Sequence, residues 1–134
     1  MTSLSPNDRL AIHELIALHG HLMDAGQLDR LGELFTADVV YDLEDFGFGA
    51  LRGSDAIRDA ALALGERNPL AHHVTNVVIG DENERGVNVR SKGLAVNADG
   101  SAGSVVYDDI VKRGEDGWRI SYRKVSARRK PLQA

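Results

Sequence analysis

The chain has 134 residues, a formal net charge of −4 and no cysteine. This length is typical of one domain whose core needs neither disulfides nor a metal for stability. The absence of cysteine excludes disulfide scaffolds, cysteine-ligated zinc and thiol nucleophiles, and we expect a cytoplasmic protein.

Membranes and nucleic acids are not expected partners. No stretch approaches the roughly 20 apolar residues of a membrane span, and the start of the chain does not pass from a basic segment into an apolar one. The main basic run, RKVSARRKP, lies at the end of the chain, which argues against a broad phosphate-binding face. We expect one domain over 1–134, with 129–134 as a flexible tail.

The first predicted element is a long helix. Ser5 suits the N-cap, Pro6 the first helical position and Asp8 the first turn. Apolar side chains then recur at helical spacing until the helix ends near Asp24, before Gly26.

Two shorter helices and one strand are expected next. The segment LDRLGELF predicts a short second helix, 39–43 a first strand, and the stretch from Ser54 to Gly65 a third helix. Between the strand and the third helix, EDFGFGALRG holds three glycines. It predicts a flexible loop or short hairpin that could cover a cavity.

The second half of the chain has the pattern of strands. About four long β-rich segments are separated by the turn sequences GDENERG, NADGSAG and GEDG. Helices followed by a meander predict an α+β fold, with three helices packed on one face of a strongly curved, mainly antiparallel sheet. Such a cone-shaped α+β barrel encloses a pocket with an open mouth.

Two adjacent histidines begin the first of these long strands. Strand alternation places His72, Val74 and Asn76 on one face and His73 and Thr75 on the other, so one histidine faces the pocket unless a bulge intervenes. A histidine titrates near neutral pH, and a carboxylate on its second ring nitrogen fixes the tautomer. Alternation alone does not choose between the two histidines.

The carboxylate could come from Asp24. It lies at the C-terminal end of the first helix, where the helix dipole disfavours a negative charge; the alternative is an exposed turn residue beside Gly26. His19 lies on the apolar side of the same helix and is either a core histidine or a site residue. Arg123 lies in WRISYRKV, either face of which could point inward.

The sequence gives little support for a metal site, a serine nucleophile or a nucleotide-binding site. The helical histidines lack the same-face i, i+4 pair with a nearby carboxylate that helical zinc sites use. The chain also has no nucleophile elbow, P-loop or dinucleotide fingerprint. We expect neither a metal nor an organic cofactor.

The segments MDAGQLDRLGELFTADVVYD, HHVTN and DGWRISYRKV resemble the SnoaL-like branch of the nuclear transport factor 2-like superfamily. The resemblance extends from about Ser5 to Arg128 and includes enzymes of the scytalone dehydratase and hexachlorocyclohexane dehydrochlorinase types. It implies that Asp24 and His72 match a catalytic aspartate–histidine pair and that Arg123 matches an arginine that assists the leaving group. A lysine of the dehydrochlorinase type is replaced here by His19.

The resulting hypothesis is a small cofactor-independent lyase or isomerase. Asp24 orients His72, which removes a proton from a hydrophobic, cyclic substrate, with Arg123 as support. Further pocket candidates are His19, Tyr41, Asn76, Tyr107 and His73. One alternative is a binding or dimerisation module with the same fold, and another is the small subunit of a ring-hydroxylating oxygenase. The resemblance also implies a homodimer.

Overall fold

The computed structural model describes residues 3–132. Its α-helices are α1 (Pro6–Asp24) and α2 (Ser54–Leu64), and its short 3-10 helices are η1 (Leu28–Glu33), η2 (Glu44–Phe46) and η3 (Gly65–Arg67). Its strands are β1 (Phe35–Asp42), β2 (Ala50–Arg52), β3 (Ala71–Asn83), β4 (Gly86–Val96), β5 (Ala102–Gly114) and β6 (Gly117–Ala127).

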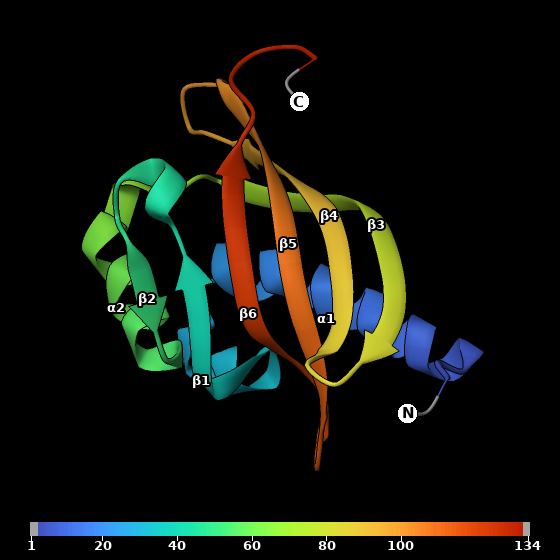
Figure 1. The fold of residues 1–134 in the computed structure, drawn as a ribbon. Helices are drawn as coiled ribbons and strands as arrows, with labels where there is room; N and C mark the ends of the chain where they lie inside the picture. Colours follow the sequence, from blue (N-terminus) through green and yellow to red (C-terminus); the bar gives the residue numbers. More distant parts are fainter. Residues whose placement is uncertain (1–2, 133–134) are drawn as a thin grey trace.

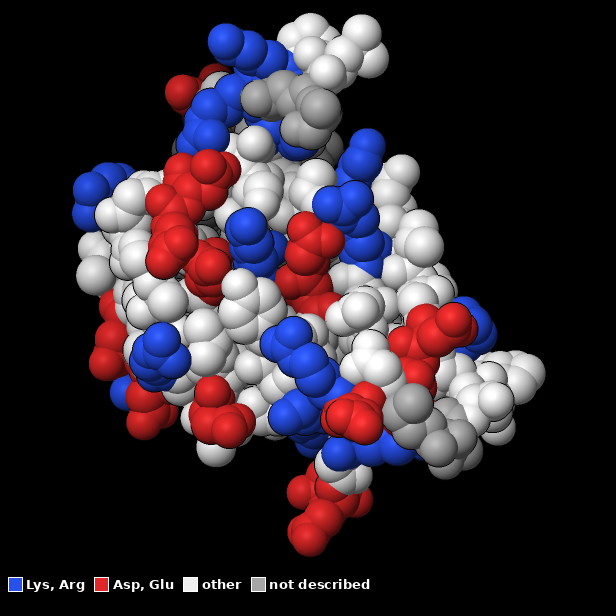
Figure 2. Space-filling view, viewed as in Figure 1, with Lys and Arg blue, Asp and Glu red and all other residues white. Residues whose placement is uncertain are grey.

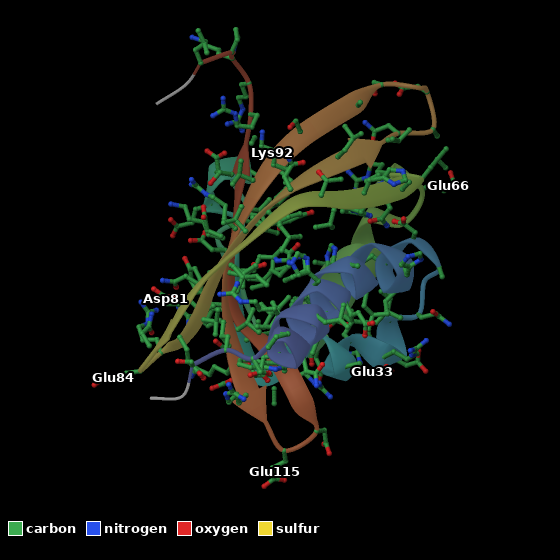
Figure 3. All side chains as sticks on the ribbon, turned by 90° about the vertical axis from the view of Figure 1, so that its right-hand side faces the viewer. Glu33, Glu66, Asp81, Glu84, Lys92 and Glu115 are labelled. Carbon is green, nitrogen blue, oxygen red and sulfur yellow. The ribbon has the colours of Figure 1, made fainter. Side chains whose placement is uncertain are left out.

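Within the described residues, six strands form one sheet in the order β2-β1-β6-β5-β4-β3, and only the β1–β6 pair is parallel. In Figure 1 the long strands β3 to β6 lie in front of α1, and α2 lies beside the short β1–β2 edge. Figure 3 shows the sheet from the side, with α1 against its inner face and Glu115 at the tip of the β5–β6 hairpin. The predicted α+β class and mainly antiparallel sheet are confirmed.

Helix α1 begins at a complete capping box. The Ser5 hydroxyl accepts a hydrogen bond from the Asp8 backbone N–H, the Asp8 carboxylate accepts one from the Ser5 N–H, and Pro6 follows the cap. Ile12 and Ile16 are fully buried against the sheet. The predicted end of the helix at Asp24 is also correct.

The glycine-rich segment after β1, expected to be a flexible loop or a short hairpin, forms the hairpin. β2 pairs antiparallel with β1, and Gly47 and Gly49 adopt positive φ angles of 81° and 67° in the connection. β1 itself begins at Phe35, four residues before the predicted start, because the Phe35 backbone pairs with Ile120 of β6. Because Phe35 and Ile120 lie far apart in the sequence, no local sequence pattern indicates that they pair.

Two irregularities break the alternation assumed for the strands. In β3 the pairing with β4 shifts between Thr75 and Val78, and Asn76 has a left-handed φ of 56°. In β6 the partner of Val111 is Ile120 and the partner of Ile110 is Tyr122, so one residue is extra. As a result Asn76 leaves the face of His72, which corrects the expected grouping, and Arg123 joins the buried face that includes Ile120.

Among the described residues, no helix is long and apolar enough to cross a membrane. The segment 129–134, expected to be a flexible tail, begins with Arg129, whose guanidinium contacts the Asp45 carboxylate at 3.2 Å. Residues 133 and 134 of that segment lie outside the described residues.

Candidate active site

Asp24 and His72 meet where the end of α1 crosses the start of β3. The Asp24 Oδ1 atom lies 2.7 Å from the His72 Nδ1 atom. The His72 backbone N–H also donates to both carboxylate oxygens, at 3.1 and 2.9 Å. These donors from β3 compensate a carboxylate that the helix dipole disfavours at this end. With Nδ1 bonded to Asp24, Nε2 is the ring nitrogen left to act on a ligand.

Gly20 permits the close crossing that forms this pair. A Cβ atom at Gly20 would overlap the His72 carbonyl oxygen of β3. Only glycine therefore fits where the helix contacts the strand, and Asp24 follows one turn later on the same side of the helix.

We expect Gly20→Ala to lower the free energy of unfolding by about 1–3 kcal/mol, the usual cost of overpacking. Alanine is intrinsically the better helix former by about 1 kcal/mol, so a net loss would report the clash. Urea unfolding measures the change. Gly32→Ala is the control, because a Cβ there meets nothing within 4 Å; equal effects of the two changes would contradict the steric explanation.

An apolar cavity of about 260 Å³ lies beside the pair, between the sheet and the helices. Aliphatic and aromatic side chains form most of its wall, and His72 is part of that wall. Its lining also includes Phe46 and Phe48 from the glycine-rich segment, which are 39% and 67% exposed. The segment expected to cover a cavity thus contributes to the lining.

Two larger hollows, of about 650 and 720 Å³, lie elsewhere on the molecule. Charged side chains such as Arg90 and Asp108 line both, and neither contains Asp24 or His72. We assign the active site to the smaller cavity because ligand pockets combine an apolar wall with a few convergent polar groups.

The polar residues of the cavity wall are His19, Tyr41, Asn68, His72 and Tyr107. The Asn68 amide already donates to the Ala61 and Gly65 carbonyl oxygens. Burial raises the pKa of both tyrosine hydroxyls, which therefore stay protonated and can donate hydrogen bonds. The Tyr107 ring occupies space that a Cβ at Gly93, on the neighbouring strand β4, would fill.

Arg123 lies behind this wall and is not among the residues that line the cavity. It is fully buried and forms a bidentate pair with Asp109, with Nε–Oδ1 and Nη2–Oδ2 distances of 2.7 and 2.9 Å. Its guanidinium carbon lies 4.2 Å from the centre of the Tyr107 ring. Burial alone would lower the pKa of Arg123, but the Asp109 charge more than offsets this and keeps the guanidinium ionised.

The structure places five of the predicted site residues at the cavity or in contact with its wall, and leaves three outside the lining. His19, Tyr41 and Tyr107 line the cavity with His72, and Asp24 supports His72 from behind. His73 is exposed and lines a separate hollow of about 250 Å³ with Asp24 and His72, and Asn76 lines a hollow on the outer face. His73, Asn76 and Arg123 are thus not among the residues that line this cavity, and their contact with a ligand stays a prediction.

Three functional residues were missed in the sequence. Asp109 follows Asp108 in the YDDI segment, and local pattern does not distinguish the buried carboxylate from the exposed one. Gly20 and Gly93 matter through contacts with distant segments. Glycine in the middle of a helix or strand was the available signal, because it usually marks a close approach.

Comparison with known proteins gives a consistent family and fold. The model of the SnoaL-like domain family matches residues 5–124. A comparison with curated proteins finds no match.

Among solved structures, a candidate aromatic ring hydroxylase from Novosphingobium aromaticivorans is 26% identical, with a TM-score of 0.78 over 95% of this chain and 93% of that one. A protein of unknown function with a cystatin-like fold from Nostoc punctiforme is 21% identical, with a TM-score of 0.80 over 98% and 100%. A candidate scytalone dehydratase from Novosphingobium aromaticivorans is 22% identical, with a TM-score of 0.74 over 97% and 93%. The last two are similar in fold alone.

Proposed function

The chain belongs to the SnoaL-like domain family, and we propose that it is a small lyase or isomerase that uses Asp24 and His72 to move a proton. The observation that supports this most is the 2.7 Å contact between Asp24 Oδ1 and His72 Nδ1 at the wall of an apolar cavity. A nucleophile or base oriented by a third group in this way is a common catalytic arrangement.

In the proposed reaction His72 Nε2 accepts a proton from a carbon of the substrate. Asp24 holds the other proton on Nδ1 and stabilises the imidazolium that forms. In an isomerase the proton then returns to the substrate at another atom. In a lyase the substrate forms a double bond as the leaving group departs with its bonding electrons, and His72 gives the proton to that group or to water. These steps use side chains alone and need no metal or organic cofactor.

The apolar wall indicates the class of substrate. Aliphatic and aromatic side chains exclude water and bind a hydrophobic, cyclic molecule, while few polar groups are available to orient it. A dry wall also strengthens the interaction between the imidazolium and the Asp24 carboxylate, which are only 21% and 26% exposed.

The test begins with native mass spectrometry of the purified protein, which identifies the small molecule that the cavity retains. Deuterium incorporation into that molecule from heavy water then reports proton removal directly. We expect exchange with the wild-type protein and strongly reduced exchange with His72→Ala. Equal exchange by both proteins would reject the proposal.

A binding module with the same fold is the second candidate, since the cavity would hold an apolar ligand without chemistry. In that case the ligand co-purifies but no exchange occurs. The similarity to a candidate aromatic ring hydroxylase favours a further alternative, the small subunit of a ring-hydroxylating oxygenase. A protein with that function would co-purify with a larger iron protein.

The homodimer implied by the resemblance stays a prediction, and we place it on the outer face of the sheet. Val78 and Leu94 are 66% and 43% exposed there. Figure 2 shows positive and negative side chains interspersed over this face, an arrangement compatible with the self-complementary contact of a two-fold dimer.

We expect light scattering to give twice the 14.5 kDa mass of one chain. Val78→Asp should yield monomers, because two buried carboxylates would face an apolar contact. Leu62→Asp, on the exposed face of α2, is the control and should remain dimeric. A wild-type mass of one chain would reject this interface.

A further inference from the structure

His19 is a buried histidine that the dyad mechanism does not use. It is 2% exposed, and its ring lines the cavity. The ring makes edge-to-face contacts with His72 and Tyr107, at centroid distances of 5.7 and 5.9 Å, and with Phe35 at 6.5 Å. It therefore lies beside the proposed base, on the same cavity wall.

The surroundings of His19 oppose a positive charge. Burial, the Arg123 guanidinium and His72 all lower its pKa, which lies well below the usual value. The carboxylates nearby are already paired, since Asp24 bonds to His72 and Asp109 pairs with Arg123. Within residues 3–132, no ion pair of His19 is found. His19 is accordingly a neutral imidazole at neutral pH.

The buried nitrogen of His19 determines where its single proton resides. Nδ1 is enclosed and has no hydrogen-bond partner in the described part of the chain. An orphaned buried N–H is rarer in proteins than an under-used acceptor, so the favoured tautomer leaves Nδ1 bare and places the proton on Nε2. Because the ring lines the cavity, Nε2 is the nitrogen that can reach a ligand.

We propose that His19 binds the ligand as a neutral hydrogen-bond donor, through Nε2–H to an uncharged carbonyl oxygen. The inference deepens the proposed function, on which it rests only for the role of His72. A neutral imidazole can polarise a carbonyl without carrying charge. The ligand class is thus an apolar cyclic ketone or a related carbonyl compound.

The adjacency of the two rings fits this class. In a carbonyl compound the oxygen and the hydrogen of the α-carbon belong to the same O=C–C–H fragment. His19 would hold the oxygen while His72 removes the hydrogen, and the negative charge that develops on oxygen would be met by a donor already in place. A halide or carboxylate ligand would require a cation at this position, which His19 does not supply.

Long-range proton–nitrogen NMR of histidine-labelled protein tests the tautomer. We expect His19 to be neutral at neutral pH, with its single proton on Nε2. Addition of 1-tetralone should shift the His19 Nε2 resonance, whereas tetralin, which has the same rings without oxygen, should leave it in place. A protonated His19 at neutral pH, or a proton on Nδ1, would overturn the proposal.

Binding measurements test the ligand class with three probes: 1-tetralone, tetralin and tetralin-1-carboxylate. We expect His19→Leu to weaken tetralone binding by at least tenfold relative to tetralin, and His19→Gln, which keeps a neutral donor, to restore most of it. His13→Leu, on the exposed face of α1, is the control. Tighter binding of the carboxylate, or no binding of tetralone, would overturn the assignment.

These outcomes are separable from those of the proposed function. The tautomer and the binding ratios need no turnover, so they can hold even if His72→Ala leaves proton exchange unchanged. Conversely, proton exchange could depend on His72 in a protein whose His19 is charged. That result would support His72 as the base and reject His19 as a neutral donor.

Discussion

Replacing His72 with alanine is expected to lower the rate of substrate proton exchange by about 10²- to 10⁴-fold, the usual contribution of a positioned base. The geometry makes this residue the base because its Nδ1 is held 2.7 Å from the Asp24 carboxylate while its ring faces the cavity. Deuterium incorporation into the bound molecule, followed by mass spectrometry, measures the rate.

The adjacent histidine offers a matched control for this experiment. His73 is exposed and is not among the residues that line the apolar cavity, so His73→Ala should leave the exchange rate within about twofold. Asp24→Asn should move the rate toward that of His72→Ala, because an amide does not stabilise the imidazolium. Equal losses in the two histidine variants would indicate a general effect on the strand and contradict the assignment.

Local sequence accounts well for the parts of the site that lie at element boundaries. The Ser5–Pro6–Asp8 start and the end at Asp24 follow from helix capping and from the apolar period. The pairing of Asp24 with His72, 48 residues away, does not follow from local pattern. It was anticipated through the family resemblance, and the close crossing at Gly20 explains how the fold achieves it.

Strand faces are the least predictable part. Alternation describes β3 from His72 to Val74 and fails at Asn76. This residue adopts a left-handed conformation within a bulge, and no glycine in the sequence indicates the bulge. A second irregularity in β6 turns Arg123 inward. Bulges depend on how neighbouring strands pair, and one extra residue exchanges the two faces of everything that follows.

Replacement of Arg123 by methionine is expected to lower the free energy of unfolding by about 3–5 kcal/mol, the cost of removing one partner of a buried ion pair. Both side chains of the Arg123–Asp109 pair are fully buried. The variant would leave the Asp109 carboxylate without its main partner in an apolar interior. Urea unfolding measures the loss.

The control is the ion pair between Arg90 and Asp108, the residue that precedes Asp109 in the sequence. Arg90 and Asp108 lie 2.9 Å apart on the outer face and are 70% and 42% exposed, so Arg90→Met should cost at most about 1 kcal/mol. The double variant Arg123→Met/Asp109→Leu should recover most of the stability lost in Arg123→Met, because it removes the unpaired charge. If proton exchange also persists in that double variant, Arg123 acts by supporting Tyr107 from behind the wall and does not take part in the reaction itself. Two outcomes would contradict this explanation: a large loss of stability in Arg90→Met, or no recovery of stability in the double variant. Either would mean that the unpaired Asp109 charge does not cause the loss in Arg123→Met.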